Sequence, residues 1–245
     1  MNNYKKNKKV LENSFNYNQK MEHDACGVGL IASTNGKKSR KIVEYGIQAL
    51  KAIWHRGAVD ADGKSGDGAG IQIEIAPGFF KEKILATGHS LDSDKRICVG
   101  MIFLPRTDYS KQEKCREIIE SALLEENYNI YGWRQVPINP NVLGKTADLN
   151  RPEIAQVMFK KNENLETNAL ERDLFETRKK IEKVARKNQL DDLYICSFSS
   201  RSIVYKGMFL AEMLSEFYPD LNDENLISRF AIFHQRYSTN TFPSW

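Results

Sequence analysis

The sequence has few cysteines, and their spacing excludes two kinds of site. Its 245 residues include only Cys26, Cys98, Cys115 and Cys196, and no two of them form a CxxC motif. A zinc site or a disulfide framework would need cysteines at closer, paired spacings. We therefore expect neither a metal site nor disulfide bonds. Cys98 and Cys196 lie in apolar segments and are interpreted as core thiols.

Long apolar segments are also absent. No run of apolar residues is long enough to cross a bilayer, and the first 20 residues lack the apolar centre of a secretory signal peptide. We therefore expect a soluble protein of the cytoplasm. An organellar targeting peptide, for a plastid in an alga or plant, is the alternative. Such peptides favour arginine and serine over the lysine and asparagine found here.

Most of the chain has no excess of charge of one sign. The formal net charge is +4, and much of it comes from lysines near the start of the chain, namely Lys5, Lys6, Lys8, Lys9 and Lys20. These lysines alternate with asparagines, and no basic helix follows them. We therefore predict a solvated, disordered leader and no binding of nucleic acid.

The apolar pattern predicts one α+β domain. Ile71, Ile73 and Ile75 alternate with polar residues, which is typical of a strand buried on one side. Apolar segments of this kind predict strands at 28–33, 71–75, 97–104, 130–136, 155–159, 193–198, 202–205 and 229–237. Helical spacing predicts helices at 38–54, 79–86, 110–125, 169–187 and 209–217, and 139–150 is predicted to be a surface loop. Strands joined by tight turns with helices outside them suggest a layered sandwich.

Cys26 lies between Ala25 and Gly27, at the start of an apolar strand. Cleavage after Ala25 would make Cys26 the first residue. An N-terminal amine, with an ordinary pKa of about 7.7–8.0, would then lie close enough to accept the thiol proton. Pairing an amine with a side-chain nucleophile is a known catalytic arrangement. The alternatives are an inert thiol and a metal site with His23 and Asp24, which the cleavage would destroy.

A glycine-rich segment, Ser65-Gly66-Asp67-Gly68-Ala69-Gly70, follows His55-Arg56-Gly57-Ala58. Glycines at alternate positions allow positive φ and a close approach of backbone N–H groups to a ligand. A strand follows directly, whereas a dinucleotide-binding motif would lead into a helix. The segment is predicted to be a turn that either supports a ligand or is purely structural. Arg56 suits either a carboxylate ligand or a structural ion pair.

The third informative segment ends the chain. Arg236 follows an apolar strand and precedes the hydroxyl side chains of Ser238 and Thr239. A bidentate guanidinium group with added hydroxyl donors is suited to an α-carboxylate. The alternative is an arginine at a strand edge, followed by a structural turn.

Together these segments resemble the N-terminal glutaminase domain of the glutamate synthase family, which belongs to the class II glutamine amidotransferases. The matching motifs are EHDACGVG at 22–29, HRGA at 55–58, SGDGAG at 65–70, SRSIVYKGM at 200–208, FYPDL at 217–221 and HQRYSTNTFPSW at 234–245. The resemblance implies an N-terminal-nucleophile hydrolase-like αββα sandwich of two antiparallel sheets, incomplete at the C-terminus. It also implies a propeptide at 1–25 and an amidotransferase domain at 26–245.

The resemblance implies a reaction and roles for individual residues. Cys26 would be the nucleophile, with its own amine as the base, and Arg236 would hold the α-carboxylate of glutamine beside Ser238 and Thr239. The thiolate would attack the side-chain amide, ammonia would leave, and water would hydrolyse the γ-glutamyl thioester to glutamate.

Supporting roles and partners are implied in the same way. Arg56, Gly66, Asp67 and Gly68 would support the nucleophile. No cofactor is expected in this segment. In the full-length enzyme, the remaining synthase domains would contain FMN and an iron–sulfur cluster and use the ammonia to aminate 2-oxoglutarate. NAD(P)H or ferredoxin would supply the electrons, and a small reductase subunit is a further implied partner.

The family pattern continues beyond Trp245 with an Asn-Gly pair for the oxyanion hole. Loss of one such donor costs on the order of a hundred- to a thousandfold in turnover, so we expect the isolated chain to be a weak or inactive glutaminase. One alternative is an inactive remnant that serves as a folding or interaction module. Another is a purine, glucosamine or asparagine type of class II amidotransferase. The long segment 97–200 and the Phe-Pro-Ser-Trp ending argue against that type.

Overall fold

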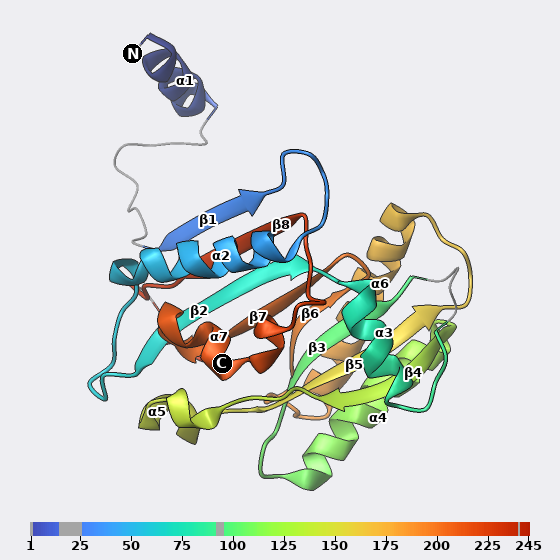
Figure 1. Ribbon diagram of the computed structural model, residues 1–245. Helices are drawn as coiled ribbons and strands as arrows, with labels where there is room; N and C mark the ends of the chain where they lie inside the picture. Colours follow the sequence, from blue (N-terminus) through green and yellow to red (C-terminus); the bar gives the residue numbers. More distant parts are fainter. Residues whose placement is uncertain (1, 15–25, 92–95, 240) are drawn as a thin grey trace.

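The computed structural model describes residues 2–14, 26–91, 96–239 and 241–245 (Figure 1). Ala25, which precedes the predicted cleavage position, lies outside the described residues, as do His23 and Asp24 of the alternative metal site. The division into a propeptide at 1–25 and a domain at 26–245 therefore stays a prediction.

The described residues form eight strands and seven α-helices. The strands are β1 (Gly27–Ala32), β2 (Ser65–Glu74), β3 (Cys98–Leu104), β4 (Tyr128–Gln135), β5 (Glu153–Lys161), β6 (Tyr194–Ser199), β7 (Ser202–Phe209) and β8 (Phe230–Gln235). The helices are α1 (Asn2–Asn13), α2 (Arg40–Ala52), α3 (Pro77–Leu85), α4 (Tyr109–Glu125), α5 (Lys145–Leu149), α6 (Thr167–Lys187) and α7 (Leu214–Phe217). No helix within the described ranges is both long and apolar enough to cross a membrane.

The strands form two four-stranded sheets in which every neighbouring pair is antiparallel. The first sheet has the order β1-β8-β2-β7, and the second has the order β4-β5-β3-β6. β6 and β7 follow each other in the chain but belong to different sheets, so their connection joins the two sheets. This arrangement confirms the predicted α+β class with two antiparallel sheets.

Helices cover these sheets on defined faces. α2 lies along β1, β8 and β2 (Figure 1), and Gly46 allows it to pack closely, because a Cβ there would lie 2.5 Å from the Cβ of Ala231. α4 and α6 pack on one face of the second sheet through buried residues that include Ile119 and Leu174. The other face of that sheet shares a core with the first sheet, in which Met101 packs near Tyr205.

The face of the first sheet that points away from α2 carries exposed apolar side chains. Val28 is 68% exposed and Leu30 is 61% exposed, while Ile232 on the neighbouring strand is 39% exposed. The register pairs Leu30 with Ile232, so these side chains form one stripe across β1 and β8. This face therefore carries an apolar stripe that is exposed in the described part of the chain.

The leader and the segment 139–150 differ from the predictions. Residues 2–13 of the leader, which was predicted to be disordered, form α1, because their lysines, Leu11 and Glu12 have good helix propensity. The predicted loop at 139–150 contains the short helix α5. The carboxylate of Asp62 accepts the backbone N–H of Thr146 at 3.2 Å, and Ser65 Oγ accepts that of Ala147 at 3.0 Å. Distant residues thus satisfy free N–H groups at the start of α5.

The far end of β2 is tied to the start of β8 by an ion pair. The carboxylate of Glu74, almost fully buried, accepts the backbone N–H of Arg229 at 2.6 Å and its guanidinium N–H groups at 2.6 and 2.9 Å. Burial alone would raise the pKa of Glu74, but the hydrogen bonds from Arg229 and the charge of Lys38 outweigh it and lower the pKa. The folded state therefore favours the ionised carboxylate.

Because its folded-state pKa is lowered, Glu74 contributes stability above the ordinary glutamate pKa of about 4.3, and that contribution is lost as pH falls below it. We expect Glu74→Gln to lower the free energy of unfolding at pH 7, with a difference from wild type that shrinks towards pH 3. Urea unfolding across this range measures it. Glu117→Gln, in an exposed pair with Lys114, is the control. A difference that stays constant with pH would contradict this account.

Candidate functional site

The pairing of β1 with β8 places Cys26 beside the segment that follows β8. Gly27 is the cross-strand partner of Gln235 in this antiparallel pair. Cys26, which precedes Gly27, therefore faces the residues that follow Gln235. Gly27 also lies against the short helical turn Trp54–Arg56. A Cβ on Gly27 would be 2.6 Å from Ile53 Cδ1 and 3.1 Å from Arg56 Cβ. Arg56 thus packs against the start of β1, as expected for a residue near Cys26.

The sulfur of Cys26 contacts the backbone of Tyr237. The N–H of Tyr237 donates to Sγ at 3.4 Å, and the thiol donates to the carbonyl oxygen of Tyr237 at 3.6 Å. Cys26 itself is half-buried. The backbone of one residue therefore holds the sulfur from two directions and leaves it partly open to solvent.

The other three thiols have surroundings that suppress reactivity. Burial raises the pKa of Cys196 to about 12 and that of Cys115 to about 11, and it also raises the pKa of Cys98 above its ordinary value. A thiol with a raised pKa yields little of the nucleophilic thiolate at neutral pH. Cys98 is fully buried, as predicted, and Cys196 packs against the core from a half-buried position.

The glycine-rich segment 65–70 was predicted to be a turn, and this prediction is wrong. It forms the first part of β2, with a break in register between Ser65 and Ala69. Gly68 has φ +130°, a conformation that side chains other than glycine rarely adopt. This irregularity directs the carbonyl oxygen of Gly68 to the end of β8, where it accepts the N–H of Arg236 at 2.8 Å. The glycines thus shape a strand irregularity instead of a turn.

Gly66 and Asp67 occupy different surroundings within this strand. Gly66 packs against the end of β7 and the segment around Ala58. A Cβ on Gly66 would lie 3.1 Å from the carbonyl oxygen of Phe209 and 3.2 Å from that of Ala58. The carboxylate of Asp67 accepts the backbone N–H of Ser238. Asp67 therefore contacts the chain that follows Arg236, whereas Gly66 is a packing residue.

The three residues predicted to bind a carboxylate lie directly after β8. The guanidinium of Arg236 donates to Thr241 Oγ1 at 2.5 Å. The hydroxyl oxygen of Ser238 is buried and has no hydrogen-bond partner among the described residues. Thr239 is exposed. The structure thus brings Arg236 and Ser238 to either side of Tyr237, which touches the thiol.

No role was predicted for Gln235 or Tyr237 from the sequence. Gln235 is fully buried, and its amide oxygen accepts the N–H of Ala211 at 2.9 Å while its Nε2 donates to Gly68 at 3.4 Å. Buried residues alternate along β8 from Ala231 through Phe233 to Gln235. The burial of Gln235 could therefore have been predicted from its position in the strand. Tyr237 acts through its backbone, which no residue type reveals.

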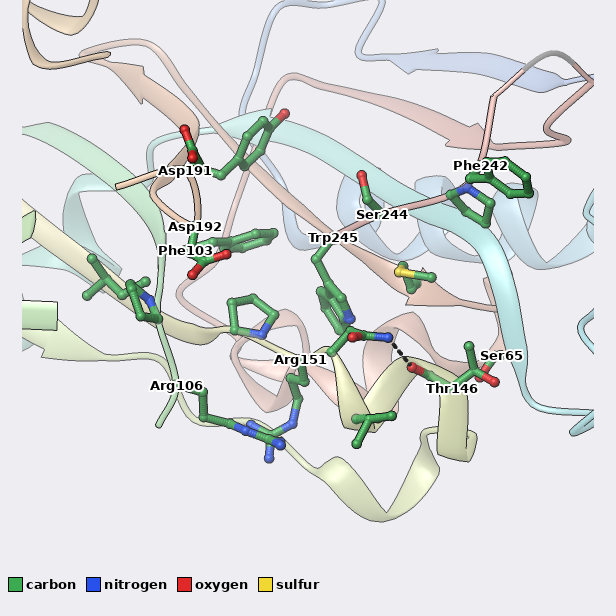
Figure 2. A pocket seen from close by; sticks show the side chains of 18 of the residues that line it. Ser65, Phe103, Arg106, Thr146, Arg151, Asp191, Asp192, Phe242, Ser244 and Trp245 are labelled. Carbon is green, nitrogen blue, oxygen red and sulfur yellow. Dashed lines mark hydrogen bonds between the residues drawn. The ribbon is translucent and has the colours of Figure 1, made fainter. Parts of the chain in front are cut away.

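A large cavity lies next to the glycine-rich part of β2. It has a volume of about 1040 Å³ and is lined by Ser65, Asp67 and the end of the chain around Trp245. In Figure 2, Arg106 and Arg151 lie below Trp245, and Asp191 lies on the other side of the cavity. A smaller cavity of about 280 Å³ is lined by Asp67, Arg236 and Trp245 among others. Cys26 is not among the residues that line these two cavities.

Comparison with known proteins places this geometry in a family. A family model for "Glutamine amidotransferases class-II" matches residues 26–245. The chain is 53% identical over 242 residues to "Glutamate synthase [NADPH] large chain" of Azospirillum brasilense, covering 99% of this chain and 16% of that protein. It is 46% identical to "Ferredoxin-dependent glutamate synthase" of Pyropia yezoensis, and 37% identical to "Glutamate synthase [NADPH] large chain" of Bacillus subtilis.

The matches to the Pyropia yezoensis and Bacillus subtilis proteins cover 91% and 94% of this chain, but only 14% and 15% of those two relatives. The chain thus spans about one seventh of the length of the curated relatives that it matches.

The contact between Gly57 and Gln235 yields a prediction. A methyl group on Gly57 would lie 2.2 Å from Gln235 Nε2, so the amide would have to leave Gly68 and Ala211. We expect Gly57→Ala to lower the free energy of unfolding by about 1–3 kcal/mol, measured by urea unfolding. Gly78→Ala is the matched control, because no atom lies within 4 Å of the added methyl group. Equal losses in both variants would contradict the contact.

Proposed function

The chain belongs to the class-II glutamine amidotransferases, and we propose that it is the glutaminase segment of a glutamate synthase, with Cys26 as the nucleophile. The observation that carries this proposal is the contact between Cys26 Sγ and the backbone of Tyr237, at 3.4 and 3.6 Å, directly after Arg236. The thiol of Cys26 thus contacts the residue that directly follows the one bearing the guanidinium group. A substrate with an amide at one end and a carboxylate at the other suits this arrangement.

The chemistry begins with removal of residues 1–25, which frees the amine of Cys26. That amine accepts the thiol proton, and the sulfur attacks the side-chain carbonyl carbon of glutamine. The C–N bond then breaks, the protonated amine returns its proton to the leaving nitrogen, and ammonia departs. Water hydrolyses the γ-glutamyl thioester, which restores the thiol and releases glutamate.

The substrate carboxylate would be bound by the segment after β8. Arg236 presents a guanidinium group whose present partner, Thr241 Oγ1, is a neutral hydroxyl that a carboxylate can replace in a stronger, charge-assisted pair. The buried hydroxyl oxygen of Ser238, without a partner among the described residues, supplies a second polar group. Thr239 completes the proposed set, and Arg56 supports the strand start against which it packs.

The whole protein would couple this glutaminase to a synthase. The relatives named above include an NADPH enzyme and a ferredoxin-dependent one, and we propose that either NAD(P)H or ferredoxin supplies electrons here, directly or through a small reductase subunit. No group of three or more metal-ligating side chains is placed for a metal ion among the described residues. We propose, from the similarity to glutamate synthases, that FMN and an iron–sulfur cluster are held by other domains of the parent protein, and no step above involves them.

Labelling by 6-diazo-5-oxo-norleucine, an electrophile shaped like glutamine, tests the role of Cys26. Intact-mass analysis is expected to show a mature species that begins at Cys26 and gains one adduct. Cys26→Ser should abolish the adduct, whereas Cys196→Ser, at the other half-buried thiol, should retain it. In the complete polypeptide, Cys26→Ala should reduce glutamine hydrolysis by about a thousandfold or more.

The opposite result favours a non-enzymatic role. A species that keeps Met1 and resists the label would support the alternative of a folding or interaction module, for which the exposed stripe of Val28, Leu30 and Ile232 offers a surface.

A further inference from the structure

Asp67 connects β2 to the peptide group that faces the thiol. Its carboxylate accepts the N–H of Ser238, and the carbonyl oxygen of Tyr237 accepts the thiol of Cys26 at 3.6 Å. That N–H and that carbonyl belong to a single peptide group. Because a trans peptide group is planar, its N–H and C=O point in opposite directions. Fixing the N–H on Asp67 therefore aims the carbonyl at the sulfur.

The preceding peptide group is fixed in a different way. Its N–H, that of Tyr237, donates to Cys26 Sγ at 3.4 Å, and the neighbouring N–H of Arg236 donates to the carbonyl of Gly68 at 2.8 Å. β8 ends at Gln235, so no strand ladder holds the chain beyond that residue. The side chain of Tyr237 is exposed and contributes little burial to hold the segment. The Asp67 carboxylate supplies the next anchor along the chain.

The irregular start of β2 makes this anchor possible. The break in register between Ser65 and Ala69, with Gly68 at positive φ, lets neighbouring residues of one strand face the same segment. Gly68 reaches Arg236 with its carbonyl oxygen, while Asp67 reaches Ser238 with its side chain. A carboxylate makes a stronger hydrogen bond to a backbone N–H than a neutral acceptor does.

We propose that Asp67 is a positioning residue, which aims the Tyr237–Ser238 peptide group at Cys26 and so fixes the sulfur relative to Arg236. This inference rests on the proposed function, in which Cys26 attacks a substrate bound by Arg236. Asp67 itself touches neither the sulfur nor the substrate carboxylate in this scheme. Its effect is on the geometry of attack, to which rates are very sensitive.

Two substitutions separate the hydrogen bond from the charge. Asp67→Asn and Asp67→Ala both remove the negative charge, but only asparagine keeps an oxygen that can accept the N–H of Ser238. For labelling of Cys26 by 6-diazo-5-oxo-norleucine in the complete polypeptide, we expect Asp67→Ala to reduce the maximal rate of inactivation about tenfold. The half-saturating concentration should change less, because Arg236 keeps its own bond to Gly68. Asp67→Asn should restore most of the rate.

The controls address folding and generic reactivity. Asp60→Ala removes a carboxylate that accepts the local N–H of Ala61 at 2.7 Å, and this variant should label like wild type. Thermal unfolding reports whether each variant is folded. Hydrogen exchange of the Ser238 amide, which needs no enzymatic activity, should be slow in wild type and Asp67→Asn, and fast in Asp67→Ala.

The possible failures are distinguishable. A complete wild-type polypeptide that is not labelled contradicts the proposed function, and with it this role of Asp67. If wild type is labelled and folded Asp67→Ala is labelled at the same rate, the proposed function stands and the positioning role is wrong. Equal exchange of the Ser238 amide in wild type and Asp67→Ala would overturn the anchor directly, whatever the labelling shows.

Discussion

The antiparallel pairing of β1 with β8 is the constraint on which the rest of the site depends. Cys26 and Tyr237 are 211 residues apart in the chain, and the hydrogen bonds between them exist only because Gly27 pairs with Gln235. Closing so long a segment carries an entropic cost. The cost is offset by the burial of the sheet against α2 and the second sheet, so the geometry of the thiol depends on the core of the protein.

Close backbone approach is the second requirement, and glycines supply it at three positions. Gly27 lets the short turn before residue 57 pack on the start of β1, Gly57 leaves room for the amide of Gln235, and Gly68 turns its carbonyl towards the end of β8. The buried amide of Gln235 then contacts three separate segments of the chain, at Gly57, Gly68 and Ala211. Polar groups inside a core are stable when they are hydrogen-bonded, and here they also set the position of the strand end that carries Arg236.

The sequence was a good guide wherever side-chain chemistry or apolar period carried the information. Alternation at Ile71, Ile73 and Ile75 located β2, and the flanking residues of Cys26 singled out its thiol. Glycines have no hydrophobic period, so the extension of β2 back to Ser65 could not be predicted from it. The helix α5 depends on Asp62, which is distant in sequence. The candidate site combines two residues that the sequence could nominate, Cys26 and Arg236, with a backbone contact from Tyr237 that only the closed sheet creates.

A crystal structure of the chain carrying the 6-diazo-5-oxo-norleucine adduct tests the central claim most directly. The account predicts a covalent bond to Cys26 Sγ, the α-carboxylate of the adduct on the guanidinium of Arg236, and the Tyr237 backbone still beside the sulfur. An adduct on Cys98, Cys115 or Cys196, or a carboxylate directed away from Arg236, would contradict it.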